Sequence, residues 1–305
     1  MLDYYKGDFY MIIEFKALNK YFNEFHVLKD INFTIESGKT FGYLGRNGAG
    51  KTTSIRILMD VFPATNGGIF IDGKPFDPKD YKIGYLPEER GMYSKSTVKD
   101  QLIYFAMLRG ASKEEALESV LYWTKRFEVD VYLDRLVETL SKGNQQKVQI
   151  TQAFLNEPDI LILDEPFSGL DPVNSQVFQT ALKEYINDDR FIIFSSHQMS
   201  YVESFCNDIA IINHGEIVLK GNLTEIKDSK GQGMVRINAS NPELLEAQLA
   251  DTDYKKDSQG FILTLLDSKE NFLSNLFKAG VDITLFENYQ PTLQDIFIEV
   301  AGDEK

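Results

Sequence analysis

Residues Gly45-Arg46-Asn47-Gly48-Ala49-Gly50-Lys51-Thr52-Thr53 form a glycine-rich segment that fits the pattern Gly-x-x-x-x-Gly-Lys-Ser/Thr of a phosphate-binding loop. The apolar, aromatic-rich stretch at 39–44 predicts a strand before it, and the apolar spacing at 54–59 predicts a helix after it. A strand, a glycine-rich loop and a helix, in that order, are the context in which this pattern binds phosphate. The segment therefore predicts that the chain binds a nucleoside triphosphate.

Each residue type in the loop has a chemical role in binding phosphate. Glycine lets backbone N–H groups approach phosphate oxygens, since a Cβ atom at these positions would block the approach. Lys51 supplies positive charge for the terminal phosphates, Thr52 offers its hydroxyl group to Mg²⁺, and the N-terminus of the following helix favours an anion. The nucleotide-binding residues expected in this loop are Gly45, Asn47, Gly48, Ala49, Gly50, Lys51, Thr52 and Thr53.

Composition restricts the class of protein. The 305 residues suggest one large domain and a smaller one. The net charge of −14 argues against nucleic acid as a partner, since binding it needs clustered Lys and Arg. Cys206 is the only cysteine, so no internal disulfide can form. His26 and His214 have no partners at metal-ligand spacing and are interpreted as ordinary surface or turn histidines. No apolar run approaches the roughly 18 residues that cross a bilayer, so a membrane role would act through partner chains.

Apolar segments that suit strands alternate with helical periodicity along most of the chain. This alternation predicts an α/β fold with a mainly parallel sheet covered on both faces. Helical spacing persists from 97 to about 140 and indicates an inserted helical subdomain, at about 90–145. A polar, glycine-containing stretch at 228–233 is expected to be a linker. The expected domains are an N-terminal extension at 1–11, a nucleotide-binding domain at 12–227 and a small α+β domain at 228–305.

The segment 159–166, Asp-Ile-Leu-Ile-Leu-Asp-Glu-Pro, predicts an apolar strand that ends in two acids. The carboxyl ends of strands are where α/β sheets bind their ligands. There, Asp164 can bind Mg²⁺, and Glu165 can orient or deprotonate a water molecule. The alternative is that both acids are simply solvated at a strand end, but the presence of the phosphate-binding loop favours the functional interpretation.

Further motifs accompany these two. Leu140-Ser141-Lys142-Gly143-Asn144 precedes a helix, Phe167-Ser168-Gly169-Leu170-Asp171-Pro172 follows the acids, and His197 follows the strand at 191–194. In this order the motifs resemble the signature, the D-loop and the switch histidine of the ATP-binding-cassette (ABC) ATPases, and Tyr21 matches the aromatic residue that stacks on adenine. The resemblance covers about residues 12–225 and implies the phosphate-loop NTPase fold of that family.

The resemblance also implies an activity and roles for residues. It implies an ATPase that uses ATP and Mg²⁺, in which two ABC subunits, identical or related, enclose two ATP molecules. The implied catalytic residues are Lys51, Glu165 and His197, the implied metal ligands are Thr52, Asp164 and Glu88, and the residues implied to contact ATP held by the second subunit are Ser141, Gly143 and Asn144.

Two places depart from the family pattern. Glu88 follows Leu86-Pro87 where a glutamine is usual; either its carboxylate offers an oxygen atom to Mg²⁺ or water, or it is a surface acid and another group is the ligand. Lys142 and Asn144 replace a glycine and a glutamine of the signature, and Lys142 either neutralises phosphate or points to solvent. These variant motifs resemble a bacterial exporter subgroup that includes sodium-extrusion ATPases.

Three functions are consistent with a phosphate-binding loop. The first is the energy-coupling subunit of an exporter, bound at the cytoplasmic face of the cell membrane to separate transmembrane permease subunits, through a groove between the inserted helices and 88–93. The second is a soluble ABC ATPase of translation or DNA repair, but such proteins usually carry two cassettes, long coiled coils or zinc motifs. The third is a kinase or GTPase, which would leave 141–145 and His197 unexplained. We favour the exporter subunit, in which ATP binding closes the dimer and hydrolysis reopens it.

Overall fold

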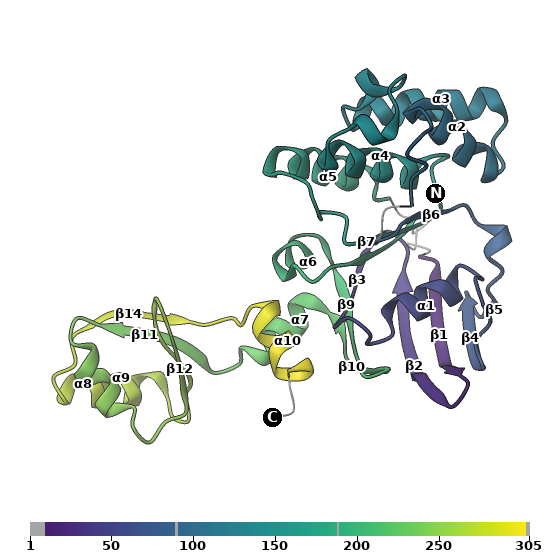
Figure 1. The fold of residues 1–305 in the computed structure, drawn as a ribbon. Helices are drawn as coiled ribbons and strands as arrows, with labels where there is room; N and C mark the ends of the chain where they lie inside the picture. Colours follow the sequence, from purple (N-terminus) through teal and green to yellow (C-terminus); the bar gives the residue numbers. More distant parts are fainter. Residues whose placement is uncertain (1–9, 89–90, 188, 303–305) are drawn as a thin grey trace, which may run out of the picture. The chain divides into compact units, whose positions relative to one another are not determined.

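The computed structural model describes residues 10–88, 91–187 and 189–302, and the chain divides between Gly221 and Asn222 into two compact units (Figure 1). The expected N-terminal extension lies mostly outside the described residues. Met11 already belongs to the first unit, because its N–H donates to the Ser37 hydroxyl oxygen and its carbonyl accepts from the Ser37 N–H.

A six-stranded sheet organises the first unit, with the strand order β10-β9-β3-β8-β7-β6. Strand β3 pairs in parallel with β8 and β9, and β7 pairs in parallel with β6 and β8. The predicted α/β fold with a mainly parallel sheet is thus confirmed. Parallel strands end at the same edge, so the carboxyl ends of β3, β7 and β8 meet there. The bounds are β3 (Thr40–Gly45), β6 (Ile83–Leu86), β7 (Ile160–Asp164), β8 (Phe191–Ser195), β9 (Asp208–Asn213) and β10 (Glu216–Asn222).

A second, antiparallel sheet packs on the first within this unit. Its order is β2-β1-β4-β5, with β1 (Ile12–Phe22), β2 (Phe25–Glu36), β4 (Asn66–Ile71) and β5 (Lys74–Pro75). The two sheets share one apolar core, in which the rings of Phe33, Phe41 and Tyr43 pack together. The β1–β2 hairpin is twisted by register shifts after Phe15, and near its turn Tyr21 lies opposite His26.

Helices α2 (Val98–Leu108), α3 (Lys113–Arg126) and α4 (Lys142–Phe154) contact one another and form the inserted helical part. Helix α3 begins at a capping box of Ser112 and Glu115, as the sequence predicts. Trp123 on α3 is buried, with its ring against Phe127 and Phe154. Other helices of the unit are α1 (Lys51–Leu58), α5 (Pro172–Tyr185), α6 (Met199–Phe205) and the 3-10 turns η1 (Pro78–Asp80), η2 (Asp130–Tyr132) and η3 (Val137–Thr139).

The second unit contains an antiparallel sheet of order β12-β13-β11-β14 with the chain order β-α-β-β-α-β, the ferredoxin-like arrangement. Its own core includes Val235, Ile237, Leu245 and Phe261. The bounds are α7 (Leu223–Lys230), β11 (Met234–Ala239), α8 (Pro242–Gln248), β12 (Tyr254–Asp257), β13 (Gly260–Thr264), α9 (Lys269–Lys278), β14 (Ile283–Asn288) and α10 (Leu293–Ala301).

The linker expected at 228–233 is corrected by the structure. Residues 228–230 are the last turn of α7, and only the turn after them leads to β11. Helix α7 begins because the Asn222 side chain accepts hydrogen bonds from the N–H groups of Thr224 and Glu225. The expected domain boundary between 227 and 228 therefore falls inside a helix, and the units divide before it.

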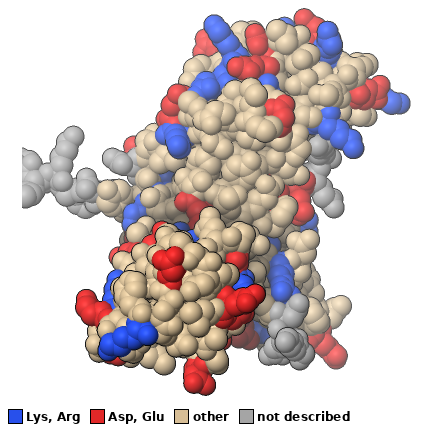
Figure 2. Space-filling view, turned by 90° about the vertical axis from the view of Figure 1, so that its left-hand side faces the viewer, with Lys and Arg blue, Asp and Glu red and all other residues tan. Residues whose placement is uncertain are grey.

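Charge on the visible surface is mixed. On the face shown in Figure 2, acidic and basic side chains alternate among uncharged residues. Within the described parts of the chain, none of the helices has the length and apolarity that a bilayer span requires.

Candidate nucleotide-binding site

The phosphate-binding loop joins the end of β3 to the start of α1. Gly50 precedes α1 with a φ of 118°, in the left-handed region that L side chains rarely adopt, and a Cβ atom on it would lie 2.7 Å from Leu28 Cδ2. A Cβ atom on Gly45 would lie 2.4 Å from the Ile212 carbonyl oxygen. Glycine is therefore required at both positions for close backbone packing, and the loop is held between β2 and β9.

Lys51 lies where the loop meets α1. Its Nζ donates hydrogen bonds to the carbonyl oxygens of Gly45, at 2.6 Å, and Arg46, at 3.2 Å. Burial lowers the pKa of Lys51, and the carboxylates of Asp164, Glu165 and Glu88 oppose that shift. Lys51 is thus fixed at the start of α1 with three acids within electrostatic range. Of the other loop residues, Asn47, Gly48 and Thr52 are exposed, Thr53 is half-buried and Ala49 is buried.

Asp164 ends β7, buried between the neighbouring strands. Its Oδ1 accepts a short hydrogen bond from the Ser195 hydroxyl group at the end of β8. Burial raises the pKa of Asp164, whereas the Ser195 hydrogen bond and the charge of Lys51 lower it. The sequence prediction placed Asp164 at this edge but missed Ser195, which the strand pairing brings to it across 31 residues of sequence.

Glu165 is held more tightly than a solvated strand-end acid. Its backbone φ is 50°, a strained value for a residue other than glycine. Oε1 accepts a hydrogen bond of 2.6 Å from the His197 N–H and lies 2.8 Å from His197 Nδ1, while Oε2 accepts one of 3.0 Å from the Ser196 hydroxyl group. The Glu165 side chain is 9% exposed and that of His197 is 73% exposed. The sequence missed Ser196, although the Ser-Ser-His run after an apolar strand was a visible signal.

Glu88 follows β6 after one residue, Pro87, at the same edge as the other two acids. It is exposed, and its charge raises the pKa values of both Lys51 and Asp164. Residues 89 and 90, which follow it in the predicted docking groove, lie outside the described residues.

The residues expected to hold Mg²⁺ suit that ion chemically. The carboxylates of Asp164 and Glu88 and the hydroxyl group of Thr52 are hard oxygen donors, and Mg²⁺ in such sites takes its other ligands from water and phosphate. Among the residues that the structure describes, no group of three or more His, Cys, Asp or Glu side chains forms a metal site by itself. Two carboxylates and a hydroxyl group therefore fit a cation that nucleotide phosphates help to hold.

Tyr21 lies near the turn of the β1–β2 hairpin and is 40% exposed. The hairpin approaches the loop, because a Cβ atom on Gly50 would lie 2.7 Å from Leu28 Cδ2 and 3.5 Å from the Val27 carbonyl oxygen. His26, whose ring stacks on Tyr21, directly precedes Val27. This packing puts the aromatic residue on the element that borders the phosphate-binding loop.

Ser141, Gly143 and Asn144 form the first turn of α4. Ser141 is exposed, and its hydroxyl oxygen accepts a hydrogen bond of 3.3 Å from the Asn144 N–H. A Cβ atom on Gly143 would lie 3.4 Å from the Gly169 carbonyl oxygen, so this turn borders the segment that follows the acids. Gln146 fixes the same contact by donating to the Pro166 carbonyl oxygen.

Comparisons with known proteins point to one family. A family model described as "ABC transporter" matches residues 28–168, and one described as "ATP-binding protein DrrA1-3-like, C-terminal domain" matches 221–301. The chain is 40% identical to the uncharacterized ABC transporter ATP-binding protein YhaQ of Bacillus subtilis, over 93% of this chain and 97% of that protein. It is 36% identical to the ABC transporter ATP-binding protein NatA of the same organism, over 67% of this chain and 85% of that protein. A solved structure of the ATP-binding subunit of an ABC transporter superimposes with a TM-score of 0.66 at 31% identity, over 72% of this chain and 93% of that one.

Proposed function

We propose that this chain, which belongs to the ABC transporter ATP-binding proteins and is an ATPase, drives separate transmembrane subunits at the cytoplasmic face of the cell membrane, in the direction of export. The observation that carries the proposal is the set of groups at one sheet edge: Lys51, Asp164 and Glu165 lie together, with His197 on the Glu165 carboxylate. The direction of transport rests on the subgroup resemblance of the motifs around Glu88 and Ser141.

The first step is the binding of Mg-ATP. Loop N–H groups and the start of α1 face the phosphates, and Lys51 exchanges its carbonyl partners for phosphate oxygens. Thr52, Asp164 and Glu88 would hold Mg²⁺, which when bound neutralises charge on the phosphate oxygens. Tyr21 stacks on the adenine ring.

In the hydrolytic step, Glu165 accepts a proton from water as the water oxygen bonds to the γ-phosphorus. The bond from that phosphorus to the β,γ-bridging oxygen breaks, and ADP and phosphate leave. Because Ser196 and His197 donate to the Glu165 carboxylate, they fix its direction. The His197 imidazole lies with Nδ1 on that carboxylate but is 73% exposed, so its exposed part can contact the phosphate. Lys51 stabilises the negative charge that develops on the β,γ-bridging oxygen as ADP leaves.

A second ABC subunit completes the site. The hydroxyl group of Ser141 is exposed at the N-terminus of α4, a 13-residue helix, where backbone N–H groups favour an anion. We assign this turn, with Gly143 and Asn144, to the ATP held by the other subunit. ATP then binds the two subunits together, and hydrolysis removes the bridging charge.

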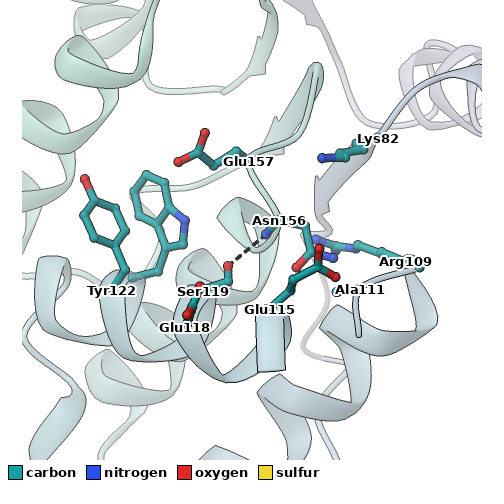
Figure 3. Close-up of a pocket in the computed structure, with 11 residues that line it drawn as sticks. Lys82, Arg109, Ala111, Glu115, Glu118, Ser119, Tyr122, Asn156 and Glu157 are labelled. Carbon is teal, nitrogen blue, oxygen red and sulfur yellow. Dashed lines mark hydrogen bonds between the residues drawn. The ribbon is translucent and has the colours of Figure 1, made fainter. Parts of the chain in front are cut away.

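We assign the membrane partner to the helical part, but at another edge than the groove expected beside 88–93, of which residues 89 and 90 lie outside the described residues. A cleft of about 530 Å³ lies between α3, the end of α2 and the residues that precede β6 and β7 (Figure 3). Arg109 at its wall is engaged, since Nη1 donates to the Gln152 carbonyl oxygen at 2.7 Å. The acids of the cleft are Glu115, Glu118 and Glu157, of which Glu157 is paired with Arg190 at 3.1 Å and Glu115 caps α3. Glu118 has no ion pair within the described part of the chain, and we assign the cleft to a segment of a permease that brings a basic side chain to it. It opens at the amino ends of the strands, the edge opposite to the acids, and leaves the nucleotide edge free.

An apolar surface extends from this cleft along α2. Tyr104, Met107 and Leu108 are 50%, 46% and 63% exposed, and Tyr93 packs its ring against that of Tyr104. Side chains of this kind beside a mixed-charge cleft are typical of a protein interface.

Affinity purification of the full chain from native membranes tests the function. We expect a polytopic membrane protein to be retained by the wild-type chain and by Glu138→Lys, a control at an exposed acid, but to be lost with Glu118→Lys combined with Tyr122→Ser. ATPase turnover of the purified subunit should not change in either variant. The absence of any integral membrane protein from the wild-type complex would contradict the transport role and favour the soluble alternative.

A further inference from the structure

The ring of Tyr21 has a partner that the site described above does not use. The His26 ring lies parallel to it, with ring centroids 3.9 Å apart and an interplanar angle of 10°. The two residues are opposite each other in the β1–β2 register, so the contact joins the two strands of the hairpin. With one face of Tyr21 covered in this way, its 40% exposure belongs to the other face and the ring edge.

His26 is itself fixed in orientation. Asn19 Nδ2 donates to the Ala17 carbonyl oxygen at 2.9 Å, and Asn19 Oδ1 accepts from the Asp30 N–H at 3.1 Å, which defines the direction of the amide. The 3.0 Å contact between that Oδ1 and His26 Nε2 then requires a proton on Nε2. The imidazole is thus a stacking partner with a defined tautomer and a defined plane.

We propose that His26 is a positioning residue, which holds the Tyr21 ring in the plane that the adenine of ATP stacks on. This inference rests on the proposed stacking of adenine on Tyr21. An exposed tyrosine on a hairpin loses side-chain freedom when a base binds to it, and that loss weakens binding. Here the stack on His26, itself held by Asn19, restricts the ring before the nucleotide arrives. The base then completes a three-layer stack of adenine, tyrosine and imidazole.

Calorimetric titration of the full chain tests the proposal with two probes. ADP carries the base and is not hydrolysed, whereas inorganic pyrophosphate contacts only the phosphate-binding loop. We expect His26→Ala to raise the dissociation constant for ADP about 2- to 10-fold and to leave that for pyrophosphate unchanged. His26→Phe, which keeps an aromatic ring beneath Tyr21, should restore most of the affinity for ADP. Phe25→Ala, at the neighbouring 74% exposed side chain, is the matched control and should have no effect.

A double-mutant cycle separates this inference from the function on which it rests. Tyr21→Ala should weaken ADP binding about 5- to 150-fold, and adding His26→Ala to it should cost nothing more. If Tyr21→Ala leaves ADP affinity intact, adenine stacking on Tyr21 is wrong and the positioning role is wrong with it. If Tyr21→Ala weakens binding but His26→Ala does not, only the role of His26 is overturned. If His26→Ala weakens the binding of pyrophosphate as much as that of ADP, His26 is merely structural. If the double variant binds ADP more weakly than Tyr21→Ala alone, His26 contacts the base separately, and the positioning role is wrong.

Discussion

Replacing Glu165 with glutamine is the sharpest test of the hydrolytic site. The substitution keeps the size of the side chain and removes its charge and basicity. The His197 N–H can still donate to the amide oxygen, and the amide nitrogen can donate to the Ser196 hydroxyl oxygen, so the hydrogen bonds at 2.6 Å and 3.0 Å have replacements. We therefore expect the fold and the nucleotide affinity to survive and the chemical step alone to fail.

The size of the effect follows from the role. General base catalysis contributes about 10²- to 10⁴-fold, or about 3–5 kcal/mol of barrier, and turnover by Glu165→Gln should fall by that factor. Phosphate release from Mg-ATP measures turnover, calorimetry with ADP measures affinity, and size-exclusion chromatography with Mg-ATP should show a trapped dimer. Glu138→Gln, at an exposed acid, is the control. Wild-type turnover in Glu165→Gln would refute the assignment, and a loss of ADP affinity would mean that the residue is structural.

Four further outcomes are expected. Lys51→Ala should weaken ADP binding about 10- to 100-fold in calorimetry, the worth of a charge-assisted hydrogen bond. Glu88→Gln should raise the Mg²⁺ concentration needed for half-maximal turnover, and an unchanged value would make Glu88 a surface acid. Burial raises the pKa of Asp164 above its ordinary value of 3.8, so ionisation of this residue destabilises the fold as pH rises. Asp164→Asn removes that charge and should raise the thermal midpoint at pH 7. The difference from wild type should shrink as pH falls toward 3.8 and Asp164 becomes protonated. Trp123→Ala should lower the free energy of unfolding by about 3–5 kcal/mol in urea titrations, because it empties a buried aromatic cluster.

Local patterns predicted the parts of the fold that local chemistry decides. The glycine-rich loop predicted a strand before it and a helix after it, and β3 and α1 flank the loop in that order. The capping box at Ser112 also depends only on neighbours in sequence. The boundary of the second unit was missed because only one residue, the N-cap Asn222, marks the start of α7 in the sequence. The polar stretch that follows resembles a linker by composition.

Contacts between distant segments were beyond reach. Ser195 and Ser196 reach the two acids only because β8 pairs beside β7. The Ser-Ser-His run marks Ser196 as a candidate polar residue, but no local pattern indicates that its partner is Glu165. The stack of His26 on Tyr21 depends on the register of a hairpin with several irregularities. Sequence patterns therefore indicated for His26 only a surface or turn histidine. The left-handed backbone of Glu165 likewise has no sequence signal, since glycine is the usual marker of that conformation.

Three unfavourable features of the first unit lie together at one edge of the sheet. Glu165 has a left-handed backbone, which costs about 1–3 kcal/mol in a residue other than glycine, and Asp164 and Lys51 both carry charges that burial disfavours. Each buried charge is opposite in sign to one part of Mg-ATP, because phosphate suits Lys51 and the cation suits Asp164. With Lys51 and Asp164 in these proposed roles, we expect nucleotide binding to stabilise the same groups that destabilise the free fold. We expect removal of the γ-phosphate to cancel part of that stabilisation at the edge where β7 and β8 end. The segment from Glu165 to Gly169 connects this edge to the turn that carries Ser141.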